Sequence, residues 1–325
     1  MLSLTAGKVG KMEKIREILT AVSRVIVGKD DKLSHLLAGI LCGGHLLVED
    51  VPGTGKTTLA KTLAAVLGCS FKRIQFTPDL MPSDIIGLSI YDRERGEFVY
   101  QPGPVMSQFV LADEINRTSP KTQAALLEAM AEKQVTVDGI SYPLPEPFIV
   151  MATQNPIEYE GTYPLPEAQL DRFMMQITLG YPDQDCEKQI VMLDPARRLP
   201  EELDKVVDAV GLIEMQKQLD CVYLASGLED YIVRLTRATR THPDLLLGVS
   251  PRGGQYLYRA SRAIAAVKGR DFVLPDDVKE LLPPVFSHRL IIRPEARLKG
   301  RTAADILQEI LIQTHVPVLI DDRAH

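Results

Sequence analysis

A short glycine-rich segment constrains this chain more than any other feature. It reads Pro52-Gly53-Thr54-Gly55-Lys56-Thr57-Thr58, directly after the apolar run HLLVED (45–50) and at the start of the helical pattern KTTLAKTLAAVLG. In a phosphate-binding loop, glycines let backbone N–H groups turn toward a β-phosphate, the lysine reaches the β- and γ-phosphates, and the next hydroxyl ligates Mg²⁺. The segment therefore predicts an ATP site over residues 52–58, with Lys56 on the phosphates and Thr57 on the metal.

One position departs from the usual spacing of such loops. The pattern G-x-x-x-x-G-K-[ST] would have glycine at position 50, where this chain has Asp50. Aspartate tolerates left-handed and capping conformations, so it can serve the same turn out of the strand.

The first half of the chain alternates short apolar runs with helical patterns. Five runs are predicted as strands: 45–50, 71–76, 109–114, 148–153 and 172–179. Helical segments between them indicate an α/β domain with a parallel sheet covered on both faces. After residue 182 the strand-like runs stop, and helices are predicted over 201–219, 228–235, 251–268, 275–282 and 302–313. We expect a nucleotide-binding α/β domain over 1–183 and a smaller all-helical domain over 184–325.

Two of the other predicted strands end in polar side chains suited to nucleotide chemistry. FVLADE ends in two carboxylates, of which we assign Asp113 to the Mg²⁺ shell and Glu114 to the attacking water. FIVMAT runs into Gln154-Asn155-Pro156, and Asn155 is the candidate for sensing the γ-phosphate. Each pattern alone also fits a non-catalytic role: the two acids could simply be solvated, and the asparagine could form a turn before proline. The order behind a phosphate-binding loop favours the catalytic interpretation.

Two arginines are candidates for stabilising the phosphate in transfer. Arg172 follows a short predicted helix and precedes the last strand, so we expect it to face the nucleotide of a neighbouring subunit. The alternative is an ion pair with Asp171 or Glu167. Arg252 follows Ser250 and Pro251, an N-cap and a first helical residue, so it is predicted to contact phosphate as a second sensor. The alternative is an ordinary surface arginine.

The remaining nucleotide contact predicted is Val27-Gly28, whose backbone precedes an apolar helix and can face an adenine edge. Two hairpins are also predicted. QVTV-Asp138-Gly139-ISYPL carries the residue pair of a tight hairpin turn, and residues 88–101 have the same general pattern.

Charge and cysteine usage restrict the class further. The chain holds 37 Lys and Arg against 43 Asp and Glu, a formal net charge of −6, which argues against a protein that coats nucleic acid. Four cysteines lack metal-ligand spacing, and neither a signal peptide nor a membrane-spanning run is visible. A cytoplasmic protein without nucleic-acid or membrane partners is expected.

The ordered set resembles the AAA+ superfamily of P-loop NTPases, in which a helical lid follows the α/β core. Within it, GGHLLVEDVPGTGKT, LADEINRTSPKTQAALLEAM, VMATQNPIEYEGTYPLPEAQLDRF, the Ser-Pro-Arg helix and His-Arg-Leu (288–290) are similar to the MoxR family. The likeness runs from about residue 14 to about 318. Gly253 and Gly254 depart from the family, which more often has alanine there.

This resemblance implies more than the spacing does. It implies a Mg²⁺-dependent ATPase that forms a ring, commonly a hexamer, with the hairpins at 88–101 and around Asp138-Gly139 lining its pore. Family members resemble chaperones that remodel client proteins, frequently with a partner containing a von Willebrand A domain. A ring motor acting on nucleic acid and a metal-chelatase motor subunit are the alternatives. The turn RERG (93–96) is the only basic tip on a pore hairpin and is interleaved with acids, which favours the protein-remodelling interpretation.

Overall fold

The core of the protein is a five-stranded parallel sheet. The computed structural model describes residues 2–156, 161–192 and 203–318. The strands lie in the order β2-β5-β8-β1-β9 and are all parallel. Their bounds are β1 His45–Glu49, β2 Phe71–Gln75, β5 Phe109–Asp113, β8 Ile149–Gln154 and β9 Phe173–Ile177. The five predicted strands are confirmed, and the sheet is the predicted α/β core.

Alternation along the buried strands divides the core between the two faces of the sheet. Leu46 and Val48 of β1 pack into one cluster with the helices on one side, whereas Leu47 packs into a second cluster on the other side. The first face is covered by α1 (Leu2–Ser23), α2 (Asp30–Leu41) and α3 (Lys56–Val66), and the second by α4 (Pro82–Ile86) and α5 (Pro120–Glu132). Side chains of successive strand residues point to opposite faces, so such near-continuous apolar runs are typical of a sheet buried on both sides.

Both predicted hairpins are present. β3 (Gly87–Asp92) and β4 (Glu97–Pro102) pair antiparallel and project from the α/β core, and β6 (Gln134–Val137) pairs with β7 (Ile140–Pro143). Asp138 and Gly139 have φ angles of 52° and 80°, the left-handed conformation that the short turn requires.

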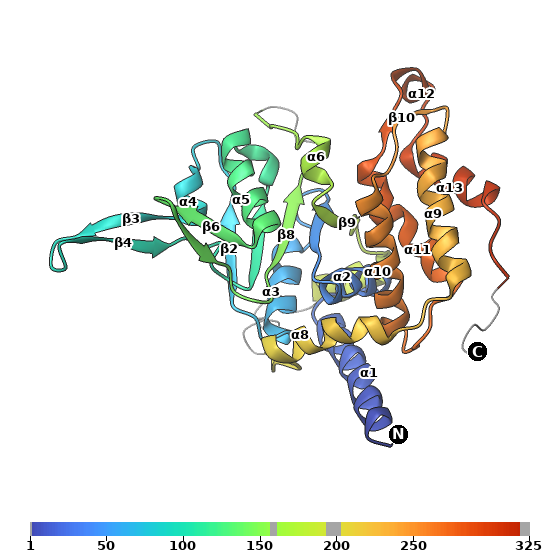
Figure 1. Ribbon diagram of the computed structural model, residues 1–325, viewed down its shortest axis with the longest axis horizontal. Coiled ribbons are helices and arrows are strands. Elements are labelled where there is room, and N and C mark those ends of the chain that lie inside the picture. The colour runs from blue at the N-terminus through green and yellow to red at the C-terminus, as the bar shows by residue number, and fades with distance from the viewer. Residues whose placement is uncertain (1, 157–160, 193–202, 319–325) are drawn as a thin grey trace.

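The C-terminal part is the predicted helical lid (Figure 1). Its main helices are α7 (Gln184–Met192), α8 (Ala209–Gln218), α9 (Ser226–Thr241), α10 (Pro251–Val267), α11 (Pro275–Phe286), α12 (Pro294–Leu298) and α13 (Ala303–Gln313). The helix predicted over 201–219 is shorter, since α8 begins only at Ala209, and residues 201–202 lie outside the described part. A short antiparallel pair, β10 (Leu245–Leu247) with β11 (Ile291–Ile292), corrects the expectation that this part is entirely helical.

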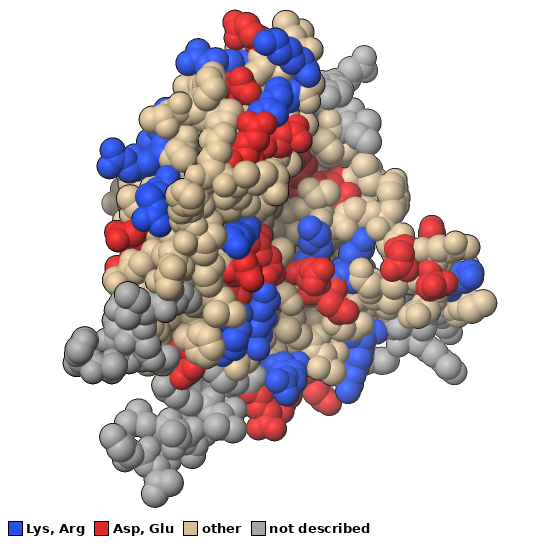
Figure 2. All heavy atoms as spheres, turned by 90° about the vertical axis from the view of Figure 1, so that its right-hand side faces the viewer, with Lys and Arg blue, Asp and Glu red and all other residues tan. Residues whose placement is uncertain are grey.

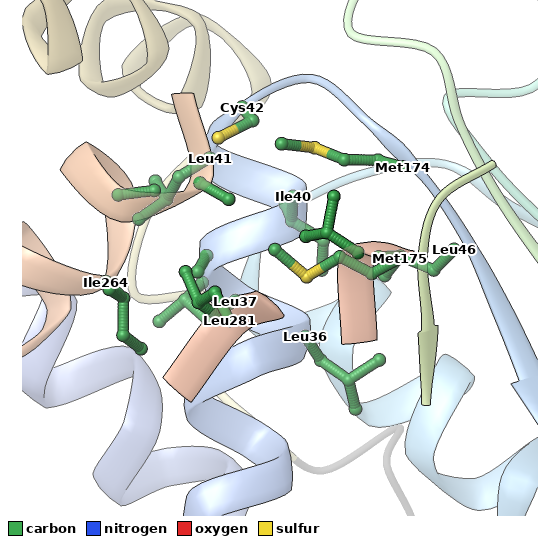
Figure 3. Packing of buried hydrophobic residues seen from close by; sticks show 14 of the residues in the cluster. Leu36, Leu37, Ile40, Leu41, Cys42, Leu46, Met174, Met175, Ile264 and Leu281 are labelled. Carbon is green, nitrogen blue, oxygen red and sulfur yellow. The ribbon is translucent and has the colours of Figure 1, made fainter. Parts of the chain in front are cut away.

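The lid and the α/β core share one hydrophobic cluster. Figure 3 shows Leu37 and Leu41 of α2 between β9 and the lid helices, with Ile264 and Leu281 close by. α8 also packs on α2, where the Gln216 side chain donates to the Ile40 carbonyl at 2.9 Å. The lid therefore rests on the face of the sheet that α2 covers. Among the described helices, none combines the length and apolar character needed to span a bilayer.

Candidate functional site

The glycine-rich loop opens onto a cavity of about 360 Å³ at the carboxyl edge of the sheet. Three strands contribute to it, because the carboxyl ends of parallel strands meet at one edge. Its lining contains most of the residues predicted to act on ATP and Mg²⁺: Pro52, Gly53, Gly55, Lys56, Thr57, Thr58, Asp113, Glu114 and Asn155. Thr153 and Gln154, which were not predicted, line it as well.

The loop has the backbone that a phosphate requires. Gly53 and Gly55 have φ angles of 85° and 83°, and a Cβ atom added at either position would meet nothing within 4 Å. Gly55 is the N-cap of α3, and no side chain accepts a hydrogen bond there. The first N–H groups of α3 therefore have no side-chain cap, and with the helix dipole they form a site for an anion. The residues present fit a nucleotide phosphate.

Lys56 is held close to the loop. Its Nζ donates to the carbonyls of Asp50 and Val51 at 2.7 and 2.9 Å. Desolvation lowers the pKa of Lys56, and the neighbouring carboxylates of Asp50, Asp113 and Glu114 oppose that shift. The ammonium is thus placed beside the cavity that the phosphate-binding N–H groups face.

Asp50 stabilises the turn at the position where such loops usually have their first glycine. Its buried carboxylate accepts N–H bonds from Val51 at 2.8 Å and from Gly180 at 2.7 Å. The side chain therefore caps the turn locally and also fastens the loop to the segment after β9. Each of its two oxygens satisfies a backbone donor that a glycine at position 50 would leave to other partners.

Asp113 is 7% exposed and sits between two partners. Arg73 donates to its Oδ2 from Nη2 at 2.7 Å and from Nε at 3.0 Å, and the Thr153 hydroxyl donates to its Oδ1 at 2.7 Å. Thr57 lines the same cavity. One carboxylate and one hydroxyl beside a phosphate cradle fit Mg²⁺, which binds through few protein oxygens together with substrate phosphates.

Glu114 is fixed by its backbone and by its side chain. It has φ 59° and ψ 50°, a left-handed conformation uncommon for this residue, and its N–H donates to the Thr153 hydroxyl at 2.8 Å. Its Oε2 accepts from Gln75 at 2.8 Å and from Arg117 at 3.1 Å. The carboxylate borders the cavity beside Asp113, where a general base could hold a water molecule.

Of the other residues predicted to contact the nucleotide, some line this cavity and some do not. Asn155 is buried and lines the cavity at the tip of β8. Thr54 does not line it and instead donates its hydroxyl to the Val51 carbonyl at 3.2 Å. Val27 and Gly28 also lie outside this lining, and a Cβ atom at Gly28 would lie 2.4 Å from the Cys186 sulfur. The structure thus brings the loop, the acids and Asn155 together at one cavity, while the adenine contact of Val27 and Gly28 stays a prediction.

Both predicted arginines lie at the opposite, amino edge of the sheet. Arg172 precedes β9, which is parallel to β1, whereas the phosphate-binding loop follows the end of β1. A five-residue strand is about 16 Å long, which is beyond the reach of an arginine side chain. Arg172 and Arg252 instead line a second cavity of about 720 Å³, together with Lys133, Lys217 and Arg259.

Arg252 does not line the cavity of its own phosphate-binding loop. Its Nη1 lies 3.8 Å from Asp171 Oδ2. Ser250 is the N-cap of α10, but its hydroxyl faces Asp171 rather than capping the helix. Arg172 does not pair with Asp171 or Glu167, since its guanidinium donates to the Leu127 carbonyl.

Sequence reasoning missed the residues that hold the two acids. Arg73 and Gln75 belong to β2, where Gln75 is in register with Asp113 of the adjacent β5. Thr153 lies on β8, the other neighbour of β5. In FKRIQF, Arg73 and Gln75 are two residues apart and so share one face of the strand. This pattern indicates a role beside the acids only once β2 is known to lie beside β5.

Comparison with known proteins agrees with this arrangement. Residues 45–175 match the ATPase family associated with various cellular activities (AAA), and residues 237–310 match the AAA lid domain. The chain is similar to the uncharacterized protein YeaC of Bacillus subtilis, with 50% identity over 91% of this chain and 93% of that protein. It is 42% identical to chaperone MoxR1 of Mycobacterium tuberculosis over 95% of this chain and 83% of the relative.

A solved structure is also similar. The crystal structure of a Cytophaga hutchinsonii protein superposes with a TM-score of 0.90 at 42% identity, covering 97% of this chain and 98% of that one. The fold, the loop and the lid define an AAA ATPase, an enzyme that hydrolyses ATP. Within that class the chain belongs to the MoxR family.

Proposed function

We propose that this ATPase forms a hexameric ring in which the neighbouring subunit completes each nucleotide site. The observation that carries the proposal is the separation of the two cavities. The loop and the acids lie at one edge of the sheet, while Arg172 and Arg252 line a cavity at the other edge. In a ring of head-to-tail contacts, the amino edge of one subunit can face the carboxyl edge of the next.

Each residue of the carboxyl edge then has one role. Lys56 and the loop N–H groups bind the phosphates, Thr57 and Asp113 hold Mg²⁺, and Asn155 contacts the γ-phosphate. Glu114 accepts a proton from the attacking water. Bound with ATP, Mg²⁺ supplies neutralisation of charge on the β- and γ-oxygens.

The arginines of the neighbour supply the remaining charge. Arg172 would stabilise the γ-phosphoryl group during transfer, and Arg252 would contact the same phosphate from the lid. Each nucleotide is then contacted by both domains of an adjacent subunit: by Arg172 of the α/β domain, residues 1–183, and by Arg252 of the lid domain, residues 184–325.

We further propose that hydrolysis drives the remodelling of client proteins in the cytoplasm, with a von Willebrand A domain protein as partner. The hairpin β3-β4 supports protein contact, because it exposes large apolar side chains: Leu88, Ile90, Tyr91 and Phe98. Phe98 is 72% exposed and packs edge-on against Tyr91. The named relative in Mycobacterium tuberculosis is a chaperone.

Charge distribution disfavours nucleic acid as the client. On the lid side of the molecule, basic and acidic side chains alternate over short distances (Figure 2). At the hairpin tip, Arg95 lies 3.6 Å from Asp92. A pore that tracks a phosphate backbone would present an excess of positive charge.

ATPase assays with and without single-stranded DNA test this choice. We expect the rate to be unchanged by DNA at moderate salt, and a several-fold stimulation would overturn the preference for protein clients. The ring itself is tested by dilution. The rate per subunit should fall as protein concentration falls, because an isolated subunit lacks the neighbour's arginines, and a constant rate would contradict a shared site.

A further inference from the structure

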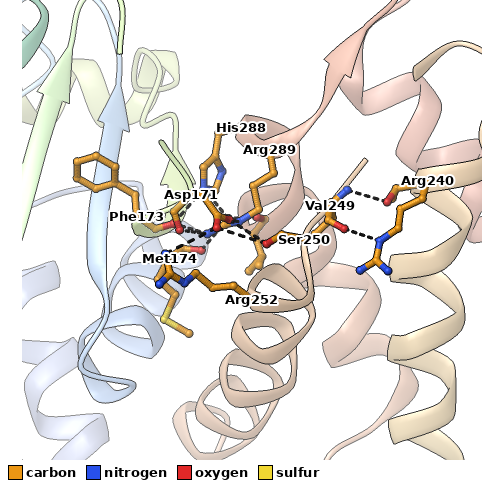
Figure 4. A network of polar contacts seen from close by, with 11 residues as sticks. Asp171, Phe173, Met174, Arg240, Val249, Ser250, Arg252, His288 and Arg289 are labelled. Carbon is orange, nitrogen blue, oxygen red and sulfur yellow. Dashed lines mark hydrogen bonds and ion pairs between the residues drawn. The ribbon is translucent and has the colours of Figure 1, made fainter. Parts of the chain in front are cut away.

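Asp171, the residue before Arg172, is contacted by three side chains of the lid (Figure 4). Arg289 donates from Nε to its Oδ1 at 2.8 Å, and Ser250 lies 3.3 Å from its Oδ2. Arg252 Nη1 lies 3.8 Å from the same Oδ2. One carboxylate thus touches the start of α10 and the segment that follows α11, and it is covalently next to the proposed arginine finger.

Arg289 is the buried centre of this network. Its side chain is 2% exposed, and it donates to the backbone carbonyls of Phe173, Val285 and Asp171. Its guanidinium also lies over the Tyr256 ring, 5.1 Å from the centroid. A planar group with five donors in fixed directions can bind several acceptors only in one arrangement. Arg289 therefore fixes the start of β9 against the lid.

Gly253 shows how closely α10 approaches this group. A Cβ atom at Gly253 would lie 3.0 Å from Arg289 Cδ and 2.3 Å from Val249 Cγ1. The glycine that follows Arg252 thus leaves room first for the Val249 side chain and then for the Arg289 side chain, which gives a physical reason for the departure from alanine at this position.

We propose that Asp171 and Arg289 are positioning residues that hold Arg172 and Arg252 as one unit for the nucleotide of the neighbouring subunit. The proposal rests on the proposed function in trans. Arg172 is fixed through its neighbour Asp171, and Arg252 through Ser250, Gly253 and the attraction of the Asp171 carboxylate. Neither positioning residue touches the nucleotide. Their loss should lower the rate of hydrolysis and leave ATP affinity unchanged.

The first variant is Asp171→Asn, which keeps the shape and one acceptor for Arg289 but removes the charge. We expect the hydrolysis rate to fall by up to about 100-fold, the loss that a displacement of about 1 Å can cause, with nucleotide affinity within about twofold of wild type. A second variant, Arg289→Lys, retains the charge and loses the planar guanidinium. It should likewise lower the hydrolysis rate and leave the nucleotide affinity unchanged. The matched control is Arg301→Ala, which breaks ion pairs with Asp244 and Glu309 inside the lid and should hydrolyse ATP normally.

Mixing experiments separate positioning from general damage. Mixed with Glu114→Gln, Asp171→Asn should regain activity, because one subunit supplies the acid and the other supplies correctly held arginines. Mixed with Arg172→Ala, it should gain nothing, because both subunits are defective at the same edge. A merely structural defect of Asp171→Asn would not follow this pattern.

The reference mixture is Arg172→Ala with Glu114→Gln. If that pair recovers activity while Asp171→Asn and Arg289→Lys fail to recover with Glu114→Gln, the positioning role is wrong and the shared site stands. If the reference pair itself recovers nothing, the shared site is wrong and the positioning role falls with it. Wild-type rates in both Asp171→Asn and Arg289→Lys also overturn the inference.

Discussion

The two edges of the central sheet differ in how many protein partners hold the charged groups that we propose act on ATP. At the carboxyl edge, Asp113 and Glu114 are each held by at least two protein donors, and Lys56 is held by two carbonyls. At the amino edge, Arg252 is half exposed and lies 3.8 Å from the nearest carboxylate oxygen, and Arg259 has no ion pair among the described residues. One edge is built to bind a nucleotide, and the other carries positive charge without a phosphate of its own.

This difference divides the reaction between two subunits on our account. Binding depends on groups within one chain, whereas hydrolysis depends on groups from two. Variants at the amino edge should therefore reduce turnover and spare affinity, and variants of the loop should reduce affinity first.

The largest effect is expected at Arg172. Arg172→Ala should still bind ATP and should lose hydrolysis by about 10³-fold, the lower end for arginine fingers. Fluorescent-nucleotide titration and a steady-state ATPase assay measure the two quantities, with Arg301→Ala as a control. A hydrolysis rate of Arg172→Ala close to that of wild type would remove Arg172 from this role.

Glu114→Gln comes next. The amide keeps the shape of the side chain but cannot accept the proton of water, so turnover should fall by about 10²-fold or more at unchanged affinity. Lys56→Ala is the contrast at the same edge, since it should weaken binding itself. Near-normal turnover of Glu114→Gln would remove this residue from its role.

Asp50 tests whether the loop depends on its unusual anchor. Asp50→Ala leaves the N–H groups of Val51 and Gly180 without their acceptor, and the free energy of unfolding should fall by about 1–3 kcal/mol. Thermal denaturation monitored by circular dichroism measures the loss. Asp50→Asn keeps one acceptor oxygen and should lose less. Equal stability of all three proteins would show that the anchor is dispensable.

An effect that is absent at neutral pH concerns His45, which begins β1 at the amino edge. Burial lowers its pKa from 6.5 to about 4, and its Nδ1 accepts the Val150 N–H at 3.1 Å, so the folded protein holds it neutral. The unfolded chain takes up the proton first, so this contribution to stability is complete above about pH 6.5 and is lost as pH falls toward 4.

Chemical denaturation of wild type and His45→Gln across that range measures the difference. Glutamine keeps an acceptor for Val150 and does not titrate, so its stability should decline less steeply between pH 6.5 and 4. Parallel pH dependence in the two proteins would show that His45 is not held neutral.

The parts of the fold that the sequence predicts are those set by local pattern. The loop, the five strands and the Asp138-Gly139 turn follow from short-range spacing and conformational preference, and each is present. The β10-β11 pair was missed because strands of three and two residues carry no periodic signal.

The parts that could not be predicted depend on how distant segments meet. Arg73 reaches Asp113 because β2 lies beside β5. The sequences of these two strands do not show that they are neighbours in the sheet. Likewise, the helix-start pattern of Arg252 predicts its local structure correctly, but the edge of the sheet that it faces is set by docking of the lid. Candidate residues could thus be named from spacing, while their grouping into two edges required the tertiary structure.

The most direct test of the shared site mixes Arg172→Ala with Glu114→Gln, each inactive alone. With random mixing in a ring, about a quarter of the interfaces pair an intact Glu114 with an intact Arg172. Our account predicts that ATPase activity returns to a substantial fraction of the wild-type rate. If Arg172 served its own nucleotide, no site in the mixed ring would hold both groups, and a mixture as inactive as its parents would contradict the account.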